Sequence, residues 1–152
     1  MGNNKSIDVF NTLIEINNDR IEGYETASTE TKEIDLKNLF KQLARTSVEN
    51  RFNLIEAVKL LGGTPVEGTK TTGKFFRVWM DVKAAITGKD RKAIFNSCEF
   101  GEDMAVSTYK KALEKSEDLN DDQTALVKKQ YVLIKADHDT VKGLRDSLVE
   151  AN

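Results

Sequence analysis

Apolar residues recur at intervals of three and four along four long segments of the chain. The segments cover residues 7–28, 35–61, 90–115 and 121–150. This is the period of an α-helix that turns one face to a core. A shorter amphipathic stretch, "KFFRVWMDVKAAITG", lies between the second and third segments. The pattern therefore predicts an all-α protein.

Residues that start or stop helices stand at the ends of these segments. Ser6 precedes the first segment and is a plausible N-cap, because its hydroxyl can accept a hydrogen bond from an unpaired backbone N–H. Gly62 and Pro65 follow the second segment and predict its end. Asn120 or Asp121 is expected to cap the last one.

The lengths of the connections predict how the helices are arranged. The first and second segments are joined by a short link, as are the third and fourth, so each pair is expected to be antiparallel. The middle connection, residues 62–89, is long enough to let the third helix start at the opposite end. This connectivity predicts a ferritin-like antiparallel four-helix bundle, with a short helix in the crossover. Residues 1–152 are expected to form a single domain.

Polar residues interrupt the apolar faces near the middle of each helix. They are Asn17, Asn50 with Asn53 at its edge, Glu102, and His138, which is the only histidine. The midpoints of antiparallel helices share one layer, so these side chains are expected to meet inside the bundle. Glu102 would then pair with His138, Lys135 or Arg145, since a buried charge is costly without a partner. The hydroxyls of Tyr24, Tyr109 and Tyr131 are expected to bond to the same layer.

The two halves of the chain carry similar spacings. Asn17, Tyr24 and Ala27 are spaced as Glu102, Tyr109 and Ala112 are, and 29 residues separate both Tyr24 from Asn53 and Tyr109 from His138. In this register Asn50-x-x-Asn53 aligns with Lys135-x-x-His138. The first helix pair therefore resembles a distant copy of the second.

Several short motifs resemble a known family. They are "GYETA", "LGGTP", "FRVWMDVKAAITG", "CEFGED", "YKKAL" and "DHDTVKGLRD", in this order. Together they are similar to a bacterial family of uncharacterised ferritin-like four-helix bundles, catalogued as a domain of unknown function. The resemblance covers nearly the whole chain and implies the bundle fold without an established activity.

Ferritin-like dimetal proteins carry one Glu on each of two helices and Glu-x-x-His on each of the others. This chain departs from that pattern, because asparagines and Lys135 stand at most of the ligand positions. Glu102 and His138 remain as competent ligands, with Glu99 one turn away. Two hypotheses follow: a purely structural polar layer without a cofactor, or a site for a single iron, manganese or zinc ion.

Composition adds limits on function. The net charge is -2, with 39% hydrophobic and 32% charged residues, so no overall attraction to nucleic acid is expected. No apolar run approaches the length of a transmembrane segment.

The single cysteine, Cys98, cannot form an internal disulfide, which favours a cytoplasmic location. Its neighbours at helical spacing are apolar, so we expect an inert buried thiol.

The crossover is basic, with seven basic and two acidic residues over positions 70–92. Lys74, Arg77, Trp79 and Lys83 define a candidate surface for an anionic partner. The alternative is a covering helix whose aromatic residues close the bundle while its lysines face water. Apolar residues around Trp79 also favour a homodimer through this helix.

No catalytic triad, phosphate-binding loop or dinucleotide motif is present in the sequence. One histidine and one cysteine leave little for acid–base or nucleophilic chemistry. We therefore expect a non-enzymatic structural or interaction protein with an unknown protein partner. The alternative is a ferritin-related metal-binding protein or oxidoreductase that uses Glu102 and His138.

Overall fold

The computed structural model describes residues 2–68 and 73–151, without the side chains of residues 2, 73–76, 116 and 149–151. The chain forms α1 (Gly2–Glu30), α2 (Ile34–Leu60), α3 (Gly73–Thr87), α4 (Arg91–Glu114), a short 3-10 turn η1 (Ser116–Asp118) and α5 (Asp121–Ala151). These described residues contain no strand. The all-α class predicted from periodicity is confirmed.

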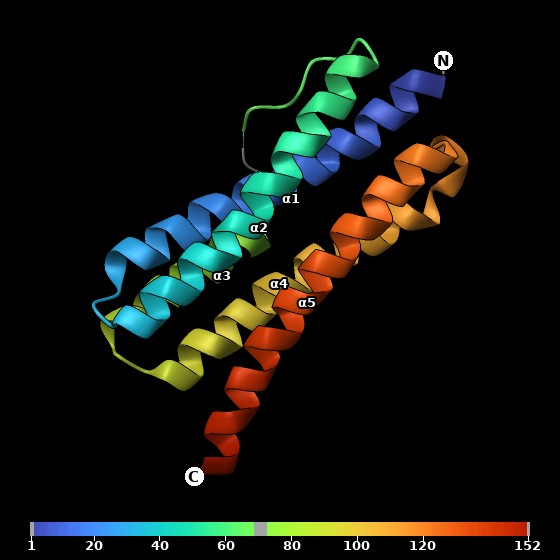
Figure 1. Cartoon of the computed structure of the whole chain (residues 1–152). Helices are drawn as coiled ribbons and strands as arrows, with labels where there is room; N and C mark the ends of the chain where they lie inside the picture. Colours follow the sequence, from blue (N-terminus) through green and yellow to red (C-terminus); the bar gives the residue numbers. More distant parts are fainter. Residues whose placement is uncertain (1, 69–72, 152) are drawn as a thin grey trace.

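The helices form two antiparallel pairs with α3 packed beside them (Figure 1). The most extensive contacts join α1 to α2 and α4 to α5, the pairs with short connections. Helix α3 contacts α4 and, to a lesser degree, α1, whereas α2 and α5 meet only slightly. The short links therefore determine the pairs, and α3 belongs to the α1–α4 side of the molecule.

Two glycines inside helices explain how α3 comes so close. A methyl group on Gly23 of α1 would overlap the indole of Trp79, and one on Gly101 of α4 would lie 3.1 Å from Val78 Cγ1. Both neighbouring side chains belong to α3. The glycines of α1 and α4 therefore admit the crossover helix, at the usual cost of glycine in a helix interior.

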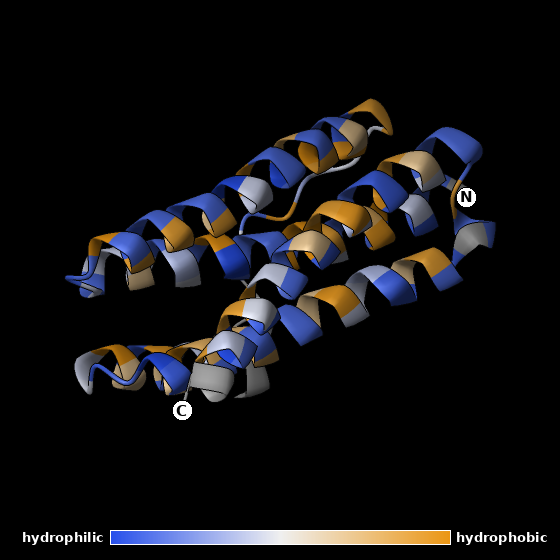
Figure 2. Cartoon of the chain, turned by 60° about the horizontal axis from the view of Figure 1, so that its bottom comes forward, coloured by the Kyte–Doolittle hydropathy of each residue, from blue (hydrophilic) through white to orange (hydrophobic). Residues whose placement is uncertain are grey.

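The apolar core has two parts. Figure 2 shows hydrophobic and hydrophilic positions alternating along the helices. One cluster of buried side chains includes Phe10, Leu54 and Ile134, and the other includes Phe40 and Val141. Buried polar residues lie between the two clusters along the sequences of α1, α2 and α4, and the partly buried Asp137 and His138 lie between them along α5. A polar band thus interrupts the core.

Side chains cap two of the helices, and the cap at Asn120 is the one that the sequence predicts. Asp90 accepts a hydrogen bond from the backbone N–H of Ala93 at 3.1 Å. Asn120 and Gln123 exchange side-chain and backbone hydrogen bonds at 2.8 and 2.9 Å, which forms a capping box. The prediction for Ser6 is wrong, because α1 begins at Gly2. Ser6 is buried within the helix and donates to the backbone oxygen of Asp118 at 2.5 Å, which ties α1 to η1.

The turn between α3 and α4 contains a strained residue. Lys89 has a φ of 55°, in the left-handed region that favours glycine. We expect Lys89→Gly to raise the unfolding free energy by about 0.5–1 kcal/mol, because it removes the steric cost of the Cβ atom. Chemical denaturation measures this change. As a control, Lys110→Gly, at an exposed position of α4, should lower the same quantity by about 1 kcal/mol; an equal loss at both positions would contradict the assignment of strain to Lys89.

Candidate functional site

The guanidinium of Arg20 lies at the centre of the polar band. Its side chain is 1% exposed. Nη2 donates to Oε1 of Glu102 at 2.8 Å and to Oδ2 of Asp137 at 3.0 Å, and Nε donates to Glu102 at 3.3 Å. Nη1 donates to the hydroxyl of Ser47. One side chain of α1 therefore links α2, α4 and α5.

Tyr24 completes the environment of Glu102. It lies one turn after Arg20 on α1, and its hydroxyl donates to the same Oε1 atom of Glu102. The guanidinium carbon of Arg20 lies 5.4 Å from the centre of the Tyr24 ring, within cation–π distance. The other oxygen of Glu102 is buried without a hydrogen-bond partner among the described residues. Glu102 is therefore neutralised by groups of its own chain.

Burial and charge act in opposite directions on the pKa values of this network. Burial alone would lower the pKa of Arg20, but attraction to Glu102 and Asp137 outweighs it, so the guanidinium stays charged. Burial raises the pKa of Asp137, and the nearby Arg20 opposes the rise. Burial, and then the charge of Glu102, raise the pKa of Tyr24 well above its usual value. The tyrosine hydroxyl is accordingly a neutral donor.

A second chain of hydrogen bonds lies beside the first. The side-chain amide of Asn17 donates to the Tyr109 hydroxyl at 2.9 Å, and this hydroxyl donates to Oε1 of Gln130 at 2.8 Å. Gln130 in turn donates to the backbone oxygen of Asn50 at 3.1 Å. Burial raises the pKa of Tyr109. These uncharged groups join α1, α2, α4 and α5 a second time.

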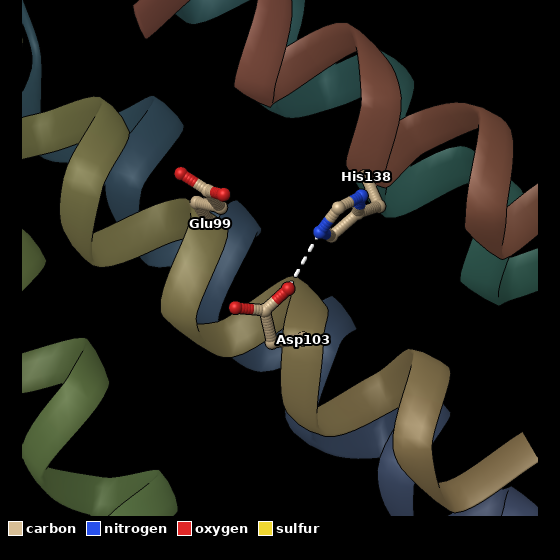
Figure 3. A group of neighbouring side chains, drawn as sticks. All are labelled: Glu99, Asp103 and His138. Carbon is tan, nitrogen blue, oxygen red and sulfur yellow. Dashed lines mark hydrogen bonds and ion pairs between the residues drawn. The ribbon is translucent and has the colours of Figure 1, made fainter.

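A third group of polar side chains lies at the seam between α4 and α5. Glu99, Asp103 and His138 each place one potential ligand atom within 4.8 Å of the others. Figure 3 shows Glu99 and Asp103 on successive turns of α4, with His138 reaching Asp103 from α5. The distance from His138 Nε2 to Asp103 Oδ1 is 2.5 Å. Glu99 also forms an ion pair with Arg145 of α5. The group has the residue types of a metal site, and it lies outside the Arg20 network.

The sequence matches the family model described as "Domain of unknown function (DUF2383)" over residues 5–115. The chain belongs to this family. No curated protein is similar enough to the chain to count as a match. The description of the family names no activity, so function has to be inferred from the side chains of this chain.

The family match ends before α5, yet α5 contributes to every polar group described above. Asp137 bonds to Arg20, Gln130 bonds to Tyr109, and His138 bonds to Asp103. The polar band therefore depends on a helix outside the matched residues.

In the part of the chain that the structure describes, no helix has both the length and the apolar character that a membrane span requires.

The structure corrects several positions of the predicted polar layer. Asn17, Asn50 and Glu102 are buried, but Asn53 is exposed. The ammonium of Lys135 bonds to Asp139 at the surface, at 2.7 Å. A helix turns about 100° per residue, so a position next to a core residue can face outward. For this reason Leu54 is buried while Asn53 is not.

The predicted partners of Glu102 are also corrected. His138 lies against Asp103 and Asp139 at the surface seam, with 12% of its side chain exposed. Arg145 pairs with Glu99, and Lys135 pairs with Asp139, so neither of them neutralises Glu102. Arg20 and Tyr24 take that place. Of the tyrosines, Tyr24 and Tyr109 bond to the polar band as expected.

Sequence reasoning missed Arg20, Asp137 and Ser47. Arg20 lies three residues after Asn17 and four before Tyr24, so helical spacing places it on the same face as both. A charged residue on an apolar face was thus visible in the pattern. Asp137 lies next to His138, and only the rotation of α5 determines which of the two faces Arg20. Asp103 was also visible, because it follows Glu99 by four residues.

The basic crossover is only partly a surface. Arg77 is exposed, and Lys83 is 57% exposed and lies 3.8 Å from Glu30. The side chain of Lys74 lies outside the described residues. Trp79 packs edge-on against Tyr24, with ring centres 4.9 Å apart, so the indole belongs to the core more than to a ligand surface. Anion binding by the remaining residues stays a prediction.

Cys98 is buried in the core beside the Arg20 network. Burial raises the pKa of its thiol well above the usual value, and the charge of Glu102 adds to the effect. A thiol with a raised pKa carries little thiolate and reacts slowly. Cys98 therefore packs as a small apolar residue.

Proposed function

We propose that the protein is a non-enzymatic helical bundle with a structural or interaction role, in which an arginine takes the place of a metal centre. The observation that carries the proposal is the buried position of Arg20 between Glu102 and Asp137. A guanidinium there supplies the positive charge that two carboxylates need in a dry interior.

A ferritin-like arrangement of the four long helices accords with the observed contacts. Helices α1 and α2 pair, α4 and α5 pair, and α3 occupies the long connection between the pairs. In such a bundle the dinuclear centre lies among side chains of all four helices. Arg20 contacts residues of α2, α4 and α5 from its position on α1, and these contacts with all the long helices support the comparison.

The residues in the polar band do not fit a dinuclear centre. Asn17 and Asn50 offer neutral amides where such a centre uses carboxylates, and one oxygen of Glu102 is engaged by Arg20 and Tyr24. A metal cation would also be repelled by the guanidinium at short range. We therefore assign the band to holding the two helix pairs in register.

The predicted homodimer through α3 is part of this proposal. Trp79 is packed within its own chain, so it leaves less apolar surface for a partner than the sequence suggests. Met80 and Phe100 remain as exposed apolar side chains on α3 and α4. Sedimentation velocity tests the dimer: a single monomeric species at all concentrations would remove it.

Metal analysis tests the central claim. Tag-free protein is purified without chelator from cells grown with added iron and manganese, and its metals are counted by mass spectrometry. We expect fewer than two ions per chain and no oxidation of added Fe(II) beyond the buffer rate. The Glu102→Gln variant should keep the metal content of the wild type while its unfolding free energy falls. Two ions per chain that are lost on Glu102→Gln would overturn the proposal.

A further inference from the structure

Glu99, Asp103 and His138 form a group that the Arg20 network does not use. Two of its residues come from α4 at a spacing of four, so their side chains share one face of the helix. The third comes from α5, across the seam between the two helices (Figure 3). Three potential ligands thus converge from two packed helices, whose packing maintains their relative positions.

We propose that this group binds a single divalent transition-metal ion, with Nε2 of His138 and one carboxylate oxygen each from Glu99 and Asp103 as ligands. Nitrogen and oxygen donors of these types suit zinc and its neighbours in the first transition row. Two carboxylates and a neutral imidazole balance the charge of a divalent cation. The side chain of Asp103 is 58% exposed, which leaves room for water at the remaining coordination position.

The distances require only side-chain movement. Ligand atoms about 2.0–2.1 Å from a tetrahedral zinc ion lie roughly 3.3 Å from one another. The three candidate atoms already lie within 4.8 Å, and His138 Nε2 is 2.5 Å from Asp103 Oδ1. The ion would separate this pair by less than an ångström, about the change that a side-chain rotation provides, and draw Glu99 inward.

Asp139 orients the imidazole of His138 in the way that a metal-binding histidine requires. Its Oδ1 lies 3.1 Å from Nδ1 of His138, so it can accept the Nδ1–H and leave the Nε2 lone pair aimed at α4. Metal-binding histidines are characteristically oriented by a carboxylate in this way. Lys135 bonds to Asp139 at 2.7 Å and fixes it in turn. With an ion bound at Nε2, this contact would hold the imidazole in the Nδ1–H tautomer that coordination needs.

Arg145 opposes metal binding at this site, and its effect on the affinity can be measured. Its guanidinium pairs with Glu99, so it lowers the affinity of that carboxylate for a cation. Removing the arginine charge in Arg145→Gln should therefore tighten metal binding. A site that served only as an ion-pair network would show no such gain.

The experiment titrates zinc into chelator-treated, tag-free full chain by calorimetry, with folding checked by circular dichroism. We expect one saturable site per chain. The variants Asp103→Asn and His138→Ala should each weaken binding at least tenfold, and Asp139→Asn about tenfold through loss of orientation. Asp81→Asn, an exposed carboxylate of α3, should leave the affinity unchanged. Arg145→Gln should increase it.

Absence of saturable binding, or equal binding by wild type and His138→Ala, would overturn the site. Either result would leave the proposed function intact, because Glu102 and Arg20 take no part in the site. A single ion lost on Asp103→Asn but kept on Glu102→Gln would support both proposals. Two ions lost on Glu102→Gln would overturn the proposed function instead.

Discussion

Replacing Arg20 with methionine is expected to lower the unfolding free energy by about 3–5 kcal/mol, because removing one partner leaves buried charges uncompensated. Glu102 would lose its cation and keep only the hydroxyl of Tyr24. Asp137 would lose its ion pair, and Ser47 would lose a donor. The change is a large share of the 5–15 kcal/mol that stabilises a typical domain.

Denaturation by guanidinium chloride, followed by circular dichroism, measures this loss. Arg45→Met, on the exposed face of α2, is the matched control and should change the unfolding free energy by less than about 0.5 kcal/mol. Adding Glu102→Gln to Arg20→Met should recover part of the stability, since the uncompensated carboxylate is removed. If Arg20→Met behaved like Arg45→Met, the central role of the guanidinium would be refuted.

The second large effect is expected at Gly23, where alanine should lower the unfolding free energy by about 1–3 kcal/mol through overpacking. A methyl group there would overlap the indole of Trp79, and the indole is confined by its contact with Tyr24. The crossover helix would then have to move away from α1. Thermal and chemical denaturation both report the change.

Gly143 offers the matched control in α5. Apart from its chain neighbours and the nearby backbone of α5, nothing lies within 4 Å of the position that its Cβ would occupy, so Gly143→Ala should raise the unfolding free energy by up to about 1 kcal/mol through better helix propensity. Opposite signs at the two glycines would show that the close approach of α3 requires a glycine at position 23. A gain at both positions would contradict that close approach.

The polar band balances its carboxylates with a cation that the chain itself supplies. The two carboxylates near Arg20 are acidic ligands of the kind that metal centres use, yet the chain supplies the balancing charge from α1. The guanidinium also brings directional N–H groups, which fix the relative positions of the helices more strictly than a point charge does. Stability and register thus come from the same side chain.

The sequence by itself determined the helices, their order and the pairing implied by short links, because these follow from local periodicity and chain length. It also indicated that polar residues interrupt the apolar faces near the middle of the chain's long helices. Glu102 could be placed inside because apolar residues surround it at helical spacing.

Only the tertiary structure decided which polar groups meet. A rotation of 100° per residue separates Asp137, which reaches Arg20, from His138, which reaches Asp103. Periodicity alone leaves the rotation of α5 about its axis uncertain by about one residue. The apolar face of α5 is wide enough to include either Asp137 or His138. The choice depends on packing against α1 and α4, and so Arg20 emerged as the partner of Glu102 only when all the helices were in place.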